Sequence, residues 1–207
     1  FHFIGLPEIR KSDSKGSAVE CSGMNYCSAC GQPVTTIVPA GDNRPRAVCG
    51  ACATIHYVNP KIVAGCVPEH QGRILLCRRA IEPRLGFWTV PAGFMELGET
   101  LSEAAIRETW EEALARVELG PLFSMVDVVH AGQVHVFFSG RLLGPDFGAG
   151  AETLETRLFR PDEIPWPELA FPSIRIALKQ HLENGPAGIV EVRLCAAPHL
   201  PLDAPPA

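Results

Sequence analysis

Three glutamates, Glu108, Glu111 and Glu112, stand at the spacing that brings side chains together on one side of an α-helix. Taken alone, they would best fit a solvated acidic helix face, because such faces are common. Their negative charges repel at this spacing, however, and a positive partner would offset them. A divalent cation suits oxygen ligands, and Mg²⁺ usually bridges carboxylates to substrate phosphates. The neighbouring residues favour a catalytic Mg²⁺ or Mn²⁺ site, as described below.

A helix over residues 100–117 is predicted to position these glutamates. Thr100 and Glu103 form a capping box at its start. At about 100° per residue, one stripe of the helix is apolar and should face the core. The residues of this stripe are Ile106, Trp110, Ala113 and Val117. Ala104 and Ala105 lie beside the glutamates and should leave room for a ligand.

Two C-x-x-C pairs form a second candidate site, with eighteen residues between them: Cys27, Cys30, Cys49 and Cys52. Each pair can supply two thiolates to a tetrahedral Zn²⁺, and the spacing is typical of zinc ribbons. Since all four positions are cysteines, no ligand position stays open and the Zn²⁺ should be structural. The stretch lacks the basic stripe with interleaved aromatic residues of a nucleic-acid module. The other cysteines are expected to be inert thiols: Cys21, Cys66, Cys77 and Cys195.

Composition narrows the class of protein. The chain has 207 residues, of which 46% are hydrophobic and 20% charged, so it can bury a sizeable core. Its formal net charge of −5 gives no general attraction to nucleic acid or to an anionic membrane. We find no run near the ~20 apolar residues of a transmembrane helix, and no export signal. We therefore expect a cytoplasmic protein in a reducing compartment.

The pattern along the chain predicts an α/β protein with a small module in front. We expect a disordered tail over 1–23, a zinc ribbon over 24–58, the main domain over 59–185 and a partly disordered extension over 186–207. Strands are expected over 61–67, 73–77, 88–90, 122–129, 134–142 and 156–160, and a second helix over 173–182. The first two strands should form a hairpin around His70, Gln71 and Gly72. Mixed strands and two separate helices indicate a layered α/β fold.

The stretch from Gly93 to Glu112 resembles the signature box of the Nudix hydrolases, G-x5-E-x7-R-E-U-x-E-E-x-G-U, where U is a bulky aliphatic residue. The positions that match in register are Gly93, Glu99, Arg107, Glu108, Glu111 and Glu112. Leu114 stands at the family's second glycine, and Thr109 and Ala115 at aliphatic positions. Residues 27–183 resemble the subgroup with a four-cysteine ribbon, which includes a plant chloroplast enzyme that hydrolyses FAD and ADP-ribose. The resemblance implies an α/β/α sandwich around a mixed sheet.

The resemblance also implies roles for single residues. Glu108 and Glu112, then Glu111, should bind the catalytic cation together with the backbone carbonyl of Ala92 or Gly93. Arg107 should orient a glutamate through a bidentate bond, and Glu99 should hold the loop. The base that deprotonates the attacking water is expected to be Glu152, with Glu155 as the alternative. Candidate substrate contacts are Arg79, Arg84 and Phe94; for each, a surface or core role is an equal or better alternative.

These features predict a metal-dependent hydrolase that cuts the pyrophosphate link of a nucleoside diphosphate derivative and releases AMP. FAD and ADP-ribose are the favoured substrates. NADH is disfavoured because the S-Q-P-W-P-F-P array of NADH-specific relatives is absent after the helix. The alternatives are a nucleic-acid-binding regulator with a Nudix-like domain, and a hydrolase that removes RNA caps or 8-oxo-nucleotides. We expect a small nucleotide as partner, with no membrane or nucleic-acid partner, and leave homodimerisation open.

Overall fold

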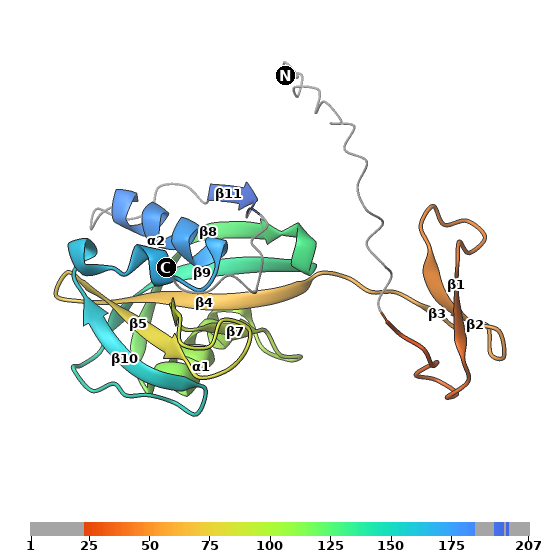
Figure 1. Ribbon diagram of the computed structural model, residues 1–207, viewed down its shortest axis with the longest axis horizontal. Helices are drawn as coiled ribbons and strands as arrows, with labels where there is room; N and C mark the ends of the chain where they lie inside the picture. The colour runs from red at the N-terminus through yellow and green to blue at the C-terminus, as the bar shows by residue number, and fades with distance from the viewer. Residues whose placement is uncertain (1–22, 185–192, 197, 199–207) are drawn as a thin grey trace, which may run out of the picture. The chain divides into compact units, whose positions relative to one another are not determined.

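The computed structural model describes residues 23–184, 193–196 and 198 (Figure 1). The chain divides into two compact units between Val58 and Asn59. The predicted tail, apart from residue 23, lies outside the described residues, and so does most of the predicted C-terminal extension. No helix in the described part of the chain has the length and apolar character that crossing a membrane requires.

The first unit is a small antiparallel sheet, in which β1 (Val34–Ile37) pairs with β2 (Arg46–Cys49) and β2 pairs with β3 (Ile55–His56). A turn over residues 28–30 precedes β1, and another over residues 50–52 lies between β2 and β3. Gly31 has a φ of 73°, a conformation that glycine adopts without steric cost, and it follows the first cysteine pair directly. A ribbon of this size buries little surface by itself, so it needs a cross-link, such as a bound metal ion, to fold stably.

The second unit is built on a mixed sheet with the strand order β10-β5-β4-β9-β8-β11. The strands are β4 (Lys61–His70), β5 (Arg73–Arg79), β8 (Val117–Val128), β9 (Gln133–Leu142), β10 (Thr153–Phe159) and β11 (Arg193–Ala196). Two short strands, β6 (Trp88–Thr89) and β7 (Ala92–Phe94), pair with β5 and β4. The pairs β4–β9 and β8–β11 are parallel and the others antiparallel. The predicted hairpin is confirmed, with its turn at Gln71 and Gly72.

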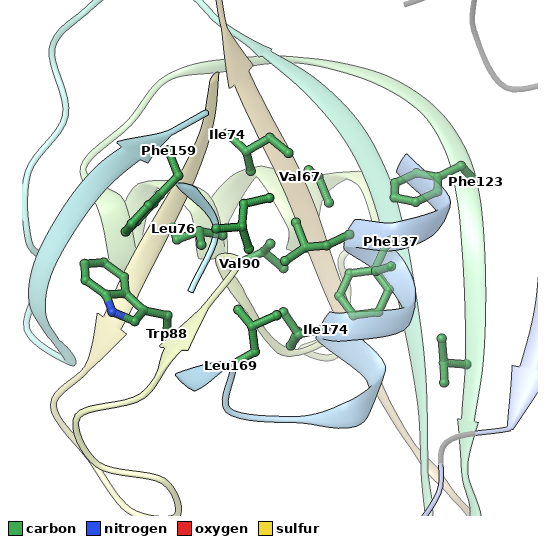
Figure 2. Close-up of a cluster of buried hydrophobic side chains, with 14 of the residues drawn as sticks. Val67, Ile74, Leu76, Trp88, Val90, Phe123, Phe137, Phe159, Leu169 and Ile174 are labelled. Atoms are coloured by element: carbon green, nitrogen blue, oxygen red, sulfur yellow. The ribbon is translucent and has the colours of Figure 1, made fainter. Parts of the chain in front are cut away.

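Two helices cover opposite faces of this sheet, and the predicted α/β/α sandwich is confirmed (Figure 1). Helix α1 (Leu101–Ala113) packs mainly on β4, and α2 (Pro172–Asn184) packs on β8. Short 3₁₀ turns complete the unit at Val129–Ala131, Pro161–Glu163 and Trp166–Glu168. Figure 2 shows the larger core, in which Ile174 of α2 meets sheet residues such as Val67 and Phe137.

The predicted extent and orientation of α1 were wrong in part. The helix ends at Ala113, and Val117 begins β8. Ile106 and Trp110 of the expected core stripe are 42% and 47% exposed.

The inward face of α1 carries small residues instead. Ala104 and Ala105 are buried against Ala64 of β4, so they do not leave the open space that we expected. Small side chains on both elements let the helix approach the sheet closely, and bulky side chains would not fit there. Glu108 lies on this same inward face, so the helix presents its acidic side to the domain and its larger apolar side chains to solvent.

The end of α1 explains the departure at Leu114. Its φ of 47° and ψ of 29° lie in the left-handed region, and its N–H donates to the carbonyl of Trp110. A non-glycine residue pays a steric cost of roughly 1–2 kcal/mol in this conformation. The glycine-like backbone therefore persists although the side chain has changed.

We expect Leu114→Gly to raise the free energy of unfolding by a few tenths to about 1 kcal/mol, because the relieved strain exceeds the roughly 0.5–1 kcal/mol entropic cost of glycine. Chemical denaturation measures the change. Leu97→Gly is the matched control, since Leu97 is fully exposed and its φ is not positive. A Leu114→Gly protein that is as destabilised as Leu97→Gly would contradict the strain argument.

Candidate functional site

Five carboxylates line a cavity of about 560 Å³ beside α1 and β7, which we call the acidic cavity. They are Glu96, Glu108, Glu111, Glu112 and Glu152. Among the described residues that line it, the only cationic side chains are Arg79 and Arg107. The structure thus brings the three helix glutamates together with Gly93, Phe94, Arg79, Arg107 and Glu152. Glu99 lies outside the lining and reaches it through Arg107.

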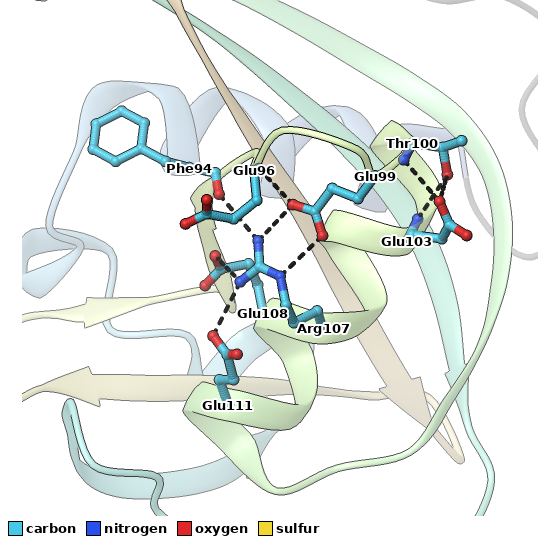
Figure 3. A network of polar contacts seen from close by, with 8 residues as sticks. All are labelled: Phe94, Glu96, Glu99, Thr100, Glu103, Arg107, Glu108 and Glu111. Carbon is cyan, nitrogen blue, oxygen red and sulfur yellow. Dashed lines mark hydrogen bonds and ion pairs between the residues drawn. The ribbon is translucent and has the colours of Figure 1, made fainter.

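Arg107 holds this arrangement together (Figure 3). Its Nε and Nη2 donate to the two carboxylate oxygens of Glu99 at 3.0 and 2.7 Å, a bidentate pair. Its Nη1 donates to Glu108 at 2.7 Å and to Glu111 at 3.0 Å. Its Nη2 also donates to the carbonyl of Phe94 at 3.1 Å, which ties β7 to the helix. One guanidinium therefore fixes two helix glutamates, a loop glutamate and a strand.

Glu99 links the same network to the loop before the helix. Its carboxylate accepts a hydrogen bond from the backbone N–H of Glu96 at 2.6 Å. Hydrogen bonds from Arg107 lower the pKa of Glu99 to about 2, and those same bonds raise the pKa of Arg107. Both groups stay ionised across the physiological range, so the bidentate pair does not titrate there.

Glu108 and Glu112 are the carboxylates that the fold takes out of water. Burial raises the pKa of Glu108, although Arg107 opposes the shift. Burial raises the pKa of Glu112 to about 8, in spite of the N–H of Ala92 that donates to it at 3.2 Å. Glu108 adds to that rise because the two negative charges repel. Glu111, by contrast, has a side chain that is 54% exposed.

A glycine is required at position 93 because the carboxylate of Glu108 lies very close to the backbone of β7. A Cβ at this position would overlap the carboxylate of Glu108, so any side chain here would force that carboxylate away from β7. The glycine of the motif therefore allows a backbone strand and a helix carboxylate to share one edge of the acidic cavity.

A second cavity, of about 490 Å³, adjoins the first, and we call it the acid-free chamber because no described residue that lines it is acidic. The two cavities share Arg79, Ala92, Gly93 and Phe94. The chamber extends to β9 and to the start of α2, where Gln133, His135 and Phe171 line it, and the predicted contact Arg84 lines it as well. The sequence prediction missed Gln133, His135 and Phe171, since no motif marks residues that meet only in the fold.

The two candidate bases lie in different places. Glu152 lines the acidic cavity, and its charge contributes to the raised pKa of Glu112. Glu155 lies on β10 and pairs with Arg78 at 3.9 Å, with both side chains nearly half exposed. The geometry therefore favours Glu152 over Glu155 for contact with a substrate.

Arg79 lines both cavities, and its guanidinium lies 5.2 Å from the ring centroid of Phe171.

The four ribbon cysteines also converge. Their four sulfur atoms all lie within 4.8 Å of one another, and they belong to Cys27, Cys30, Cys49 and Cys52. His56 places its Nε2 3.3 Å from the sulfur of Cys27. Cys66 and Cys77 are buried on strands, and burial raises the pKa of the Cys66 thiol to about 12, so it stays protonated. Cys21 and the side chain of Cys195 lie outside the described residues.

Comparison with known proteins agrees with this geometry. The family model described as NUDIX domain matches residues 59–180, and the one described as Nudix N-terminal, a zinc ribbon, matches residues 25–58. The crystal structure of a Nudix hydrolase from Nitrosomonas europaea is 47% identical, with a TM-score of 0.80, and the match covers 84% of this chain and 98% of that one.

Two curated relatives are similar over part of the chain. An ADP-ribose pyrophosphatase of Methanocaldococcus jannaschii is 32% identical over 119 residues, which are 56% of this chain and 69% of that protein. An NAD-capped RNA hydrolase of Chromobacterium violaceum is 38% identical over 91 residues, or 43% of this chain and 33% of that protein. The chain thus spans about two thirds of the first relative and a third of the second. With its helix network and ribbon, this chain belongs to the Nudix family and carries that family's zinc-ribbon module ahead of its Nudix domain.

Proposed function

We propose that this chain hydrolyses the pyrophosphate link of a nucleoside diphosphate derivative in a divalent-cation-dependent reaction. The observation that carries the proposal is the convergence of Glu108, Glu111 and Glu112 on one cavity, with Glu108 and Glu112 largely buried. Buried like charges are costly, so a cluster of this kind needs a cation to stabilise it in its ionised form.

The donor set suits Mg²⁺ or Mn²⁺. Carboxylate oxygens and a backbone carbonyl are the ligands that hard cations prefer, and no cysteine or histidine is found among the described residues that line the acidic cavity. Glu108, Glu112 and Glu111 would hold the cation with the carbonyl at Ala92 or Gly93. A bound cation would supply the positive charge that offsets the pyrophosphate oxygens and would help to activate water for attack.

The chain's own residues supply the rest of the chemistry. Glu152 would accept the proton of the attacking water, because it lines the same cavity as the cation ligands. Arg107 and Glu99 act as positioning residues, since their bonds fix Glu108, Glu111 and β7. Arg79 would bind a substrate phosphate where the two cavities meet.

Glu112→Gln and Glu108→Gln should each lower kcat by orders of magnitude, because each removes a charged cation ligand. Steady-state kinetics at saturating Mg²⁺ measures this. Glu118→Gln is the control, since Glu118 is an exposed partner of Arg141 on the sheet. Near-normal turnover of either variant would contradict the ligand assignment.

Glu112→Gln should also change the pH dependence of stability in protein without added Mg²⁺. A carboxyl whose folded pKa is raised stabilises the fold fully below its ordinary pKa, and that stability is lost as pH rises toward the folded pKa. For Glu112 this window runs from 4.5 to about 8. The Tm of Glu112→Gln should therefore exceed that of the wild type by more at about pH 8 than at about pH 5. A difference in Tm that does not depend on pH would argue against a buried carboxylate.

The choice of base can be tested with a matched pair. We expect Glu152→Gln to lower kcat by roughly 10²–10⁴-fold, the usual contribution of general base catalysis. Glu155→Gln should leave kcat nearly unchanged, because Glu155 lies outside both cavities and pairs with Arg78. A loss in Glu155→Gln alone would reverse the assignment.

We also propose that the ribbon binds structural Zn²⁺ through Cys27, Cys30, Cys49 and Cys52, whose four sulfurs are close enough to share one ion. Purified protein should contain about one zinc per chain by elemental analysis. Cys27→Ser should lower that content, whereas Cys66→Ala should not, because Cys66 is buried on β4. Zinc-free protein with freely alkylated Cys27 and Cys49 would refute the proposal.

For the substrate we propose ADP-ribose or FAD, cleaved to AMP and the other phosphorylated half. Similarity to the archaeal ADP-ribose pyrophosphatase supports ADP-ribose, while the relatives named as NAD-capped RNA hydrolases make NADH the competitor to test. We expect kcat/KM for ADP-ribose or FAD to exceed that for NADH at saturating Mg²⁺. A tenfold preference for NADH, about 1.4 kcal/mol in transition-state stabilisation, would reject the substrate class and leave the chemistry standing.

A further inference from the structure

The acid-free chamber differs in character from the acidic cavity beside it. No acidic residue and no lysine occurs among the described residues that line it. Its two arginines lie against aromatic rings, with Arg79 5.2 Å from the centroid of Phe171 and Arg84 5.0 Å from that of Phe87. Phe94 is 46% exposed at the border of the two cavities. Aromatic rings and guanidinium planes both stack on flat aromatic groups, so these walls suit a flat aromatic ligand.

Strand β9 places a polar pair in this apolar surrounding. Gln133 and His135 are two residues apart on one face of the strand, and both line the chamber. His135 is only 8% exposed, and its Nε2 lies 2.9 Å from the side-chain oxygen of Gln133. Burial lowers the pKa of His135 to about 4, so the imidazole is neutral at physiological pH.

The tautomer follows from this hydrogen bond. An amide oxygen accepts, so the proton lies on Nε2 of His135 and Nδ1 carries a lone pair. Nδ1 is buried and has no hydrogen-bond partner among the described residues. An imidazole this well shielded holds one orientation, and it fixes the carboxamide of Gln133 through its single bond. The amide N–H₂ group and a second lone pair of Gln133 then stay available for a ligand.

We propose that Gln133, positioned by His135, selects a neutral heteroaromatic group whose edge carries an N–H donor beside a lone-pair acceptor. A carboxamide pairs with such an edge through two hydrogen bonds, as glutamine does with adenine. Adenine, the carboxamide of nicotinamide and the flavin ring all offer this edge. The inference rests on the proposed function, which places the pyrophosphate at the adjoining acidic cavity and so brings one end of the substrate to the chamber.

Binding of phosphate-free probes isolates the chamber from the cation site. The intact protein, without added Mg²⁺ or Mn²⁺, is titrated with adenosine, nicotinamide and riboflavin, and Kd is measured by ligand-observed NMR. We expect at least one probe to bind, which identifies the half of the substrate that enters. Gln133→Met should raise its Kd at least tenfold, about 1.4 kcal/mol. Gln71→Met, the same change at an exposed turn outside both cavities, should leave Kd unchanged.

The role of His135 as a positioning residue has its own readout. His135→Phe should weaken the probe as Gln133→Met does, whereas His135→Gln, which keeps a donor for Gln133, should restore most of the affinity. Thermal melts check folding, and Gln133→Glu replaces Gln133→Met if the latter unfolds. Gln133→Glu should raise the Kd of the same probe because the substitution removes the N–H donor.

Two results would overturn the inference: no probe binds the wild type, or both Gln133 variants bind as the wild type does. Cation-dependent hydrolysis is measured on the same preparation. Hydrolysis without probe binding rejects this inference alone, and probe binding without hydrolysis rejects the proposed function alone.

Discussion

The second unit depends on one constraint: carboxylates on the inward face of α1 are buried close together, and their mutual electrostatic repulsion must be offset. Arg107 meets part of this demand by binding Glu99, Glu108 and Glu111 at once. Gly93 meets another part, since only a residue without Cβ leaves room for the carboxylate of Glu108 against β7. Removing one partner from such a network leaves a buried charge unpaired, which costs more than the pair contributes when intact.

The same constraint explains why the helix is turned against its apolar pattern. Because Ala104, Ala105 and Glu108 face the sheet, the larger side chains Ile106 and Trp110 face outward. Arg116 partly covers Trp110, with its guanidinium 5.7 Å from the ring. The apolar stripe of a helix therefore does not predict which face is buried when acidic side chains occupy the inward face. The carboxylates of the acidic cavity and the acid-free chamber meet along β7, whose residues Ala92, Gly93 and Phe94 line both cavities.

Sequence alone predicted the features that are local. The capping box at Thr100, the hairpin turn at Gln71, the cysteine pairs and the glutamate spacing depend on neighbours within a few residues, and the structure has them. The helix end was misplaced because Leu114 adopts a backbone conformation that its side chain disfavours. The chamber could not be predicted, because Gln133 and Phe171 come together only through the packing of α2 on the sheet. The sequence already placed Glu152 ahead of Glu155 as the expected base, and the fold adds a physical reason, because Glu152 lines the acidic cavity whereas Glu155 pairs with Arg78.

If the buried glutamates of α1 bind a divalent cation, as we propose, then Mn²⁺ binding can be measured by electron paramagnetic resonance. Free Mn²⁺ gives a strong signal that weakens on binding, and thiolates of the ribbon are poor ligands for it. We expect saturable binding to the wild type and to Glu118→Gln. A Glu108→Gln, Glu112→Gln double variant that remains folded should bind Mn²⁺ at least tenfold more weakly, about 1.4 kcal/mol. Equal Mn²⁺ affinity in the wild type and the double variant would contradict this proposal.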